Sequence, residues 1–129
     1  MILAVADTSV LIASETGRDL DVDRLPDELA VSVITVGELR AGVLAAPDVG
    51  TRDRRLATLL SVLALDPVPI DQGVAESWAR LRLLLRHSGK RMPVNDSWIA
   101  ATAISLGVAV VTQDDDYDVG IEGLAVIHV

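Results

Sequence analysis

The chain has 129 residues, a net charge of −8 and no cysteine. It is long enough to bury a hydrophobic core, and without cysteine it can form neither a disulfide framework nor a thiolate metal site. The acidic balance argues against non-specific binding to nucleic acid, which usually needs a basic surface. Hydrophobic residues make up 50% of the chain, which indicates either a large apolar core or extra apolar surface covered by a partner or a second subunit.

The N-terminus and the hydropathy profile predict a cytoplasmic protein. The first residues, Met-Ile-Leu-Ala-Val-Ala, lack a basic leader and reach Asp7 too early for a signal sequence. No apolar run approaches the roughly 18 residues expected of a membrane span. We therefore expect no contact with a membrane.

The first part of the chain predicts a strand and a short helix. Residues 2–6 are apolar without alternation, which is typical of a strand buried on both faces. Residues 10–14 are expected to form one or two helical turns. Residues 17–28 are polar and charged, which predicts a loop or a frayed helix.

The middle of the chain repeats this order. Residues 29–34 predict a second buried strand, and residues 35–46 predict a helix that Pro47 ends. Residues 51–63 form an amphipathic helix pattern with a leucine stripe. Residues 65–70 contain two prolines, so any strand there is short and lies at a sheet edge.

The last part of the chain predicts two helices and two strands. Asp71 can cap a helix that runs to about His87. An alanine-rich helix begins near Asn95, and Gly107 stands where helices commonly stop. Residues 108–112 and 124–129 predict the last two strands.

Strands and helices thus alternate from end to end. This order predicts an α/β fold, with a parallel sheet covered by helices on both faces. No repeat, low-complexity tract or linker interrupts it, so we expect residues 1–129 to form a single domain.

Carboxylates stand at four places where a predicted strand gives way to the next element: Asp7, Glu38, Asp96 and the run Asp114-Asp115-Asp116. Loops after the carboxyl ends of parallel strands lie on the ligand side of the sheet, as do the helix N-termini that follow. Carboxylates gathered there repel one another unless a cation joins them. An all-oxygen cluster suits Mg²⁺ or Mn²⁺. The two histidines match no ligand spacing.

Each acid also has an ordinary structural explanation. Asp7 could end a strand in a turn, and Asp96 could be an N-cap. Glu38 fits a capping box in which its side chain returns to the backbone of Thr35. The three aspartates could form a solvated loop. Together these explanations require four coincidences on one rim of the sheet, so the metal site is favoured.

The motifs that contain these acids resemble those of a known family. The chain's ordered motifs are similar to those of PIN-domain ribonucleases, above all the VapC-type toxins of toxin–antitoxin pairs. The motifs are Asp7-Thr8-Ser9-Val10-Leu11-Ile12, Thr35-Val36-Gly37-Glu38-Leu39-Arg40-Ala41-Gly42, Asn95-Asp96-Ser97-Trp98-Ile99-Ala100-Ala101-Thr102-Ala103 and Thr112-Gln113-Asp114-Asp115-Asp116-Tyr117.

The resemblance covers essentially the whole chain. It implies a PIN-like domain with a five-stranded parallel sheet in which the first and fourth strands are adjacent. It also implies a Mg²⁺- or Mn²⁺-dependent endoribonuclease, an RNA substrate, a homodimer and a cognate antitoxin that blocks the site.

The resemblance also assigns roles to residues. It implies catalytic and metal-binding roles for Asp7, Glu38, Asp96 and Asp114. Asp116 falls at the family's less constant additional metal-binding acid, whereas Asp115 falls between motif positions. Thr8, Ser9 and Thr112 would support the site through their hydroxyls. Tyr117 stands where Phe is commoner, a departure that we expect to be harmless.

The implied chemistry is hydrolysis of an RNA phosphodiester by a metal-activated water. Asp96 or Asp114 would orient or deprotonate that water. Phosphate attraction would come from Arg52, Arg54 and Arg55 or from Arg86, Lys90 and Arg91. The alternative for these cations is a solvated helix face.

Two other functions fit an α/β chain with acids at strand ends. One is a phosphoacceptor domain of the receiver type, which needs an acid pair after the first strand and a lysine near the last strands. This chain has a lone Asp7 there, and its only lysine is Lys90. The other is a non-catalytic module that binds a regulator, against which the four intact acids argue.

Overall fold

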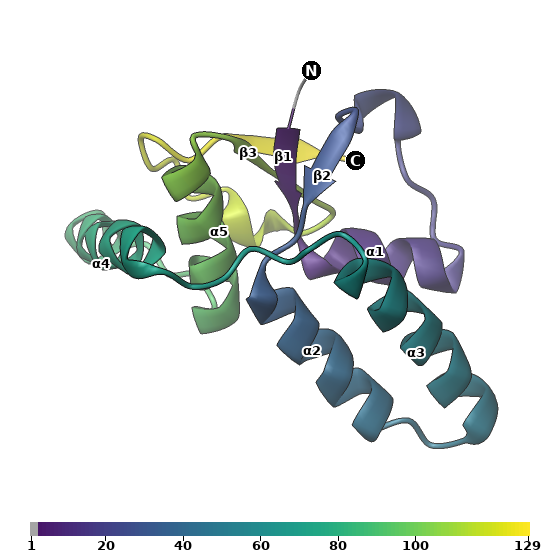
Figure 1. Cartoon of the computed structure of the whole chain (residues 1–129). Coiled ribbons are helices and arrows are strands. Elements are labelled where there is room, and N and C mark those ends of the chain that lie inside the picture. The colour runs from purple at the N-terminus through teal and green to yellow at the C-terminus, as the bar shows by residue number, and fades with distance from the viewer. Residues whose placement is uncertain (1–2) are drawn as a thin grey trace.

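The computed structural model describes residues 3–129 of the chain. The elements in chain order are β1 (Leu3–Ala6), α1 (Thr8–Thr16), η1 (Val22–Arg24), β2 (Glu28–Ala30), α2 (Val33–Leu44), α3 (Val49–Leu63), α4 (Gln72–His87), α5 (Val94–Leu106), β3 (Ala109–Thr112), η2 (Asp115–Tyr117) and β4 (Val126–His128) (Figure 1). The predicted first strand is confirmed from Leu3 onward, and its predicted start at Ile2 lies outside the described residues.

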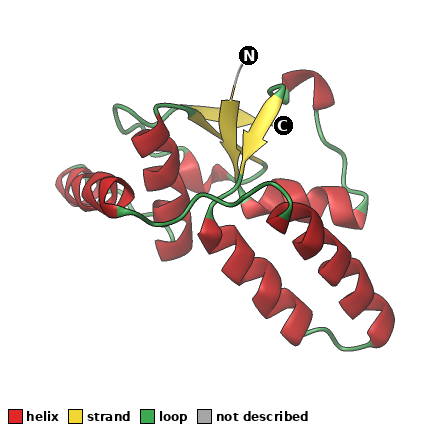
Figure 2. Cartoon of the chain, viewed as in Figure 1, coloured by secondary structure: helices red, strands yellow, loops and turns green. Residues whose placement is uncertain are grey.

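The sheet is parallel throughout, with the strand order β2-β1-β3-β4. The pairing of β1 with β3 confirms the predicted adjacency of the first strand and the strand at residues 108–112. Parallel strands bring their carboxyl ends to one edge, so Asp7 after β1 and Asp114 after β3 are brought to the same edge of the sheet. Figure 2 shows the short sheet at the top of the view, with helices below it and on either side.

Residues 3–129 form a four-stranded sheet, and the expected five-stranded sheet is therefore wrong by one strand. Residues 65–70 form only a single parallel bridge, between Ser32 and Val68, beside the edge strand β2. The amide of Val68 donates to the Val31 carbonyl, and the amide of Val33 donates to the Val68 carbonyl. Pro67 and Pro69 flank this bridge and have no amide hydrogen to extend it.

The second strand and the helix after it also differ from the prediction. Strand β2 ends at Ala30, and α2 begins at Val33, whereas the sequence predicted a strand to residue 34. Ser32 caps α2 by accepting a hydrogen bond from the Ile34 amide at 3.0 Å. The apolar run continues across this boundary, so hydrophobicity alone did not mark it.

Helices cover both faces of the sheet. Val5 and Val110 pack with α5 and α4 in one core cluster, while Ala4 and Val111 pack with α1 in another. Alternate residues of each strand point to opposite faces, which explains why β1 and β3 are almost uniformly buried.

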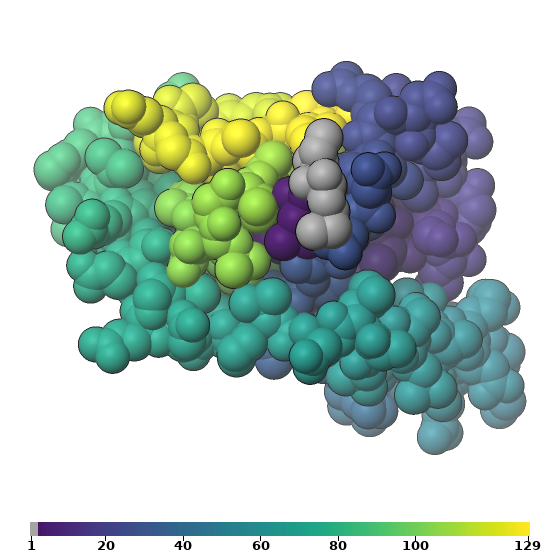
Figure 3. Space-filling model, turned by 45° about the horizontal axis from the view of Figure 1, so that its top comes forward, coloured from purple at the N-terminus to yellow at the C-terminus, as the bar shows by residue number. Residues whose placement is uncertain are grey.

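Two helix pairs flank this centre. Helices α2 and α3 run side by side away from the sheet, and α4 lies against α5 (Figure 1). In Figure 3, the teal surface of α3, the following connection and α4 extends along one side of the molecule toward the yellow C-terminal segment. Asp71 caps α4, as predicted, and Gly107 ends α5 with a φ of 70°.

Candidate active site

Asp7 lies at the centre of the site, between β1 and α1. It is 2% exposed, and its backbone amide donates to the Val111 carbonyl at 2.8 Å, which continues the β1–β3 pairing. Its side chain caps α1 by accepting from the Ser9 amide at 3.4 Å. Asp7 is therefore a helix cap, yet a buried carboxylate needs more than one long hydrogen bond.

Two hydroxyls complete the surroundings of Asp7. Tyr117 donates to Oδ1 at 2.8 Å, and Thr112 donates to Oδ2 at 3.0 Å. Burial, followed by the negative charge of Asp7, raises the pKa of Tyr117 well above its ordinary value, so its hydroxyl remains a donor. Three elements thus hold this carboxylate: the start of α1, the end of β3 and η2.

Glu38 does not form the capping box that the sequence also allowed. Because α2 begins at Val33, Glu38 is its sixth residue and Thr35 is already inside the helix. The Glu38 carboxylate instead accepts a 2.8 Å hydrogen bond from the Thr8 hydroxyl. Thr8 has a single hydroxyl proton, so the buried Thr35 donates in turn to Thr8 across 2.9 Å.

Asp96 is the third residue of α5, and Pro93 is the N-cap. Burial, and then the negative charges of Asp7, Asp116 and Glu38, raise the pKa of Asp96 to about 7. A helix N-terminus favours a negative charge, so the crowding by other carboxylates outweighs that effect here.

Asp114 is the second residue after β3. Its amide donates to the Thr112 hydroxyl at 2.9 Å. The Ser9 hydroxyl lies 3.3 Å from the same Thr112 hydroxyl. Burial, and then the charges of Asp7 and Asp116, raise the pKa of Asp114 above its ordinary value, and Arg18 opposes this rise.

A cavity of about 270 Å³ gathers these residues. Four carboxylates from four segments of the chain line it, together with two hydroxyl side chains, one cation and one apolar side chain: Asp7, Glu38, Asp96, Asp114, Thr8, Ser9, Arg18 and Ile12. Asp116 is exposed and does not line the cavity, although its charge acts on Asp96 and Asp114. The structure thus brings together the four acids that stood apart in sequence.

Comparison with known proteins identifies the fold family. Residues 4–120 match the family model described as PIN domain. The chain belongs to the PIN-domain family.

Within this family the chain is similar to VapC-type proteins. It is 49% identical over 125 residues to Ribonuclease VapC5 of Mycobacterium tuberculosis, covering 97% of this chain and 92% of that protein. It is 50% identical over 115 residues to Ribonuclease VapC4 of the same organism, covering 88% of each. A solved structure described as a member of the VapBC family of toxin-antitoxin systems, VapBC-5, from Mycobacterium tuberculosis superposes with a TM-score of 0.92, 45% identity and full coverage of both chains.

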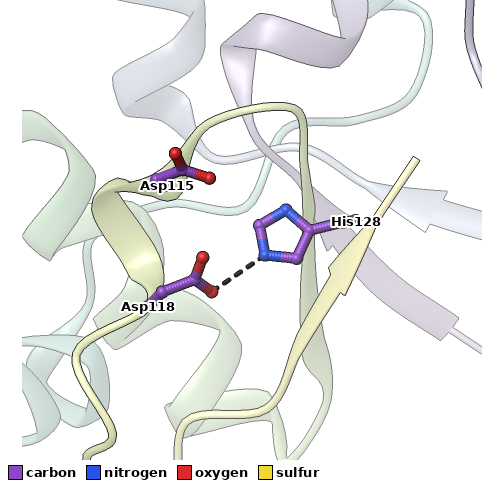
Figure 4. Close-up of side chains that lie close together, drawn as sticks. All are labelled: Asp115, Asp118 and His128. Carbon is purple, nitrogen blue, oxygen red and sulfur yellow. Dashed lines mark hydrogen bonds and ion pairs between the residues drawn. The ribbon is translucent and has the colours of Figure 1, made fainter.

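This PIN domain holds a second group of possible metal ligands. Asp115, Asp118 and His128 place one ligand atom each within 4.8 Å of one another, and His128 Nε2 lies 2.8 Å from an Asp118 oxygen (Figure 4). Pairing of β4 with β3 brings His128 beside Thr112. The two aspartates are exposed, and their interaction with His128 is an ordinary surface ion pair when the histidine is protonated. Sequence spacing gave no sign of it.

Sequence reasoning missed three contributors to the site of this PIN domain. Tyr117 appeared there only as a harmless departure, but its hydroxyl makes a contact that Phe cannot make. Thr35 appeared only as a helix start, and Arg18 was not singled out. Each of these contacts depends on segments far apart in the chain.

None of the described helices is long and apolar enough to cross a membrane.

Proposed function

We propose that this PIN-domain protein is a Mg²⁺- or Mn²⁺-dependent endoribonuclease that acts as the toxin of a toxin–antitoxin pair. The observation that carries the proposal is the single cavity lined by Asp7, Glu38, Asp96 and Asp114. Relatives about half identical to this chain are named ribonucleases, which supports RNA as the substrate.

The donor set fits a divalent cation. The candidate ligands are carboxylate oxygens of Asp7, Glu38, Asp96 and Asp114, with Asp116 close enough to add its charge. Hard oxygen ligands suit Mg²⁺ and Mn²⁺. The raised pKa of Asp96, about 7, reflects a concentration of negative charge that a bound cation would offset.

When bound, the cation would supply positive charge to the scissile phosphate and lower the pKa of the attacking water. Without a cation the pKa of Asp96 is about 7 and that of Asp114 is raised, so these two carboxylates are the candidates to orient or deprotonate that water. Tyr117 and Thr112 fix both oxygens of Asp7. Thr8 fixes Glu38, so two of the acids are held in place before substrate arrives.

RNA cleavage with and without metal tests this function. The purified protein should cut RNA in Mg²⁺ or Mn²⁺ and stop in EDTA, leaving 5′-phosphate and 3′-hydroxyl ends. Cleavage that persists undiminished in EDTA would contradict the metal site. A 2′,3′-cyclic phosphate product would instead indicate attack by the RNA 2′-hydroxyl.

The proposed partners are an antitoxin and a second copy of the chain. The solved relative with a TM-score of 0.92 is described as a member of the VapBC family of toxin-antitoxin systems, and another, 30% identical with a TM-score of 0.75, is FitAcB from Neisseria gonorrhoeae. The α2–α3 pair exposes large apolar side chains, with Leu44 80%, Val49 72% and Leu60 57% exposed. Apolar surface of this kind is commonly covered by a protein partner.

The receiver-type alternative gains no support from the site. Lys90, the single lysine of the sequence, lines a different cavity and not the one with the acids. Incorporation of phosphate from a small phosphodonor would be needed to favour that function.

A further inference from the structure

A basic cavity of about 310 Å³ lies where α4 ends and α5 begins. Four cationic side chains line it, and no carboxylate does: Arg82, Arg86, Lys90 and Arg91. The buried Leu85 and Met92 complete its lining. The whole chain has only 11 Lys and Arg residues and a net charge of −8, so this is a marked local concentration of positive charge.

These cations are available to a ligand. None of the four takes part in a salt bridge with any residue from 3 to 129, whereas the neighbouring Arg80 pairs with Glu76. Arg82 lies 5.7 Å from the Trp78 ring centre, and that ring stacks on Trp98 of α5 at 4.3 Å. The aromatic stack therefore ties the position of Arg82 to the helix that also carries Asp96.

Three consecutive residues connect the basic cavity to the acidic one. Val94 lines the basic cavity, Asn95 lines a groove of about 500 Å³ against α2, and Asp96 lines the acidic cavity. Glu38 lines both the groove and the acidic cavity. Residues 94 to 96 all belong to the first turn of α5, so the three hollows lie around the same end of that helix.

We infer that the basic cavity binds phosphates of a single RNA strand next to the bond that is cut. This rests on the proposed function, which places one phosphodiester at the acidic cavity. An RNA chain continues beyond that phosphate, and in this cavity its neighbouring phosphates would meet four cationic side chains and no carboxylate. Contacts of this kind position the strand and carry no sequence information. Two of the three other candidate cations are engaged locally: Arg55 donates to the Gly42 carbonyl and Arg54 to the Thr51 hydroxyl.

Binding without cleavage tests this inference. In an Asp96→Asn background, the affinity for a short fluorescent single-stranded oligoribonucleotide is measured by anisotropy, with Mg²⁺ present, across about 50 to 200 mM salt. Adding Arg86→Gln and Arg91→Gln should weaken binding roughly tenfold at low salt. The slope of log affinity against log salt should fall by about 1.4, since each single-strand phosphate contact contributes about 0.7.

A matched control removes two charges elsewhere. Arg24→Gln with Arg80→Gln makes the same change in net charge, on η1 and on an exposed pair of α4, and should leave the affinity within about twofold. All four positions are exposed, and unfolding curves verify that the variants fold.

Equal weakening by both pairs would overturn the inference, because the effect would then be net charge alone. It would also be overturned if the variant with Arg86→Gln and Arg91→Gln bound RNA normally but lost affinity for an oligoglutamate peptide. The cavity would then be a site for an acidic protein segment. Wild-type protein that binds RNA through the cavity but never cuts it would contradict the proposed function and leave this inference standing.

Discussion

The hydroxyl of Tyr117 donates a 2.8 Å hydrogen bond to Oδ1 of Asp7, joining residues 110 positions apart in the sequence. Both groups are buried, at 1% and 2% exposure. Because Thr112 donates to the other oxygen, Asp7 is oriented from two sides before any ligand arrives. An active-site carboxylate fixed in this way loses little freedom when a cation binds.

Tyr117→Phe should therefore lower both the stability of the fold and the affinity for the metal. It removes one charge-assisted hydrogen bond and keeps the ring packing, so the free energy of unfolding should fall by about 1–3 kcal/mol. Mg²⁺ affinity, measured by calorimetry, should fall as well, because Asp7 is held less firmly. Unchanged values in both measurements would show that the departure from Phe is harmless, as the sequence suggested.

Thr112 offers a cleaner test of a supporting hydroxyl. Thr112→Val keeps the shape but removes the donor to Asp7 and the acceptor for the Asp114 amide, so we expect a loss of about 1–3 kcal/mol and lower cleavage. Thr112→Ser keeps the hydroxyl and is the control, with most of both properties retained. If Val and Ser behave alike in denaturant and cleavage assays, the hydroxyl does not support the site.

Glu38→Gln separates charge from structure. The amide oxygen of Gln can still accept from the Thr8 hydroxyl, so stability without metal should stay within about 0.5 kcal/mol of wild type. Cleavage and Mg²⁺ binding should be largely lost, since the amide has no negative charge. Cleavage at the wild-type rate would exclude Glu38 from the metal site.

Asp96→Asn should change the pH dependence of stability without metal. The folded pKa of Asp96, about 7, lies above its ordinary value of 3.8. As pH rises from about 4 to 7, the unfolded chain gives up this proton first, so wild-type stability falls, and the loss is complete above about pH 7. Asn removes that loss.

The variant should thus be more stable than wild type at pH 8, by about 1–2 kcal/mol once screening of this half-exposed group is allowed for, and the gain should shrink toward pH 4. Asp53→Asn, at an exposed position of α3, is the control and should change stability by less than about 0.5 kcal/mol. Mg²⁺ should stabilise wild type and have little effect on Asp96→Asn. A variant that unfolds would show that Asp96 is structural.

The exposed apolar side chains predict self-association. Leu83 and Leu84 of α4 are 50% and 44% exposed, in addition to those of α2 and α3. Light scattering at micromolar concentration should give the mass of a dimer. A monomer at that concentration would contradict the homodimer.

The sequence pattern predicted the alternation of strands and helices, and the resemblance to the PIN-domain family implied that β1 and β3 are neighbours. Periodic apolar patterns, the start signal at Asp71 and the stop signal at Gly107 act locally, so the sequence alone reveals them. The sequence did not mark the helix and strand boundaries that fall inside continuous apolar runs. The start of α2 at Val33 depends on the Ser32 cap and on the bridge to Val68, which is distant in sequence.

The sequence by itself placed Asp7 and Asp114 after strands and Asp96 near the start of a helix, and through its ordered motifs it determined the family. Only the tertiary structure decided how those acids are held. Glu38 became a partner of Thr8 and not of Thr35, and Tyr117 became a donor to Asp7. The physical reason is that a buried carboxylate takes its hydrogen-bond donors from whichever segments the sheet brings near it. These pairings produce no periodic pattern in the sequence.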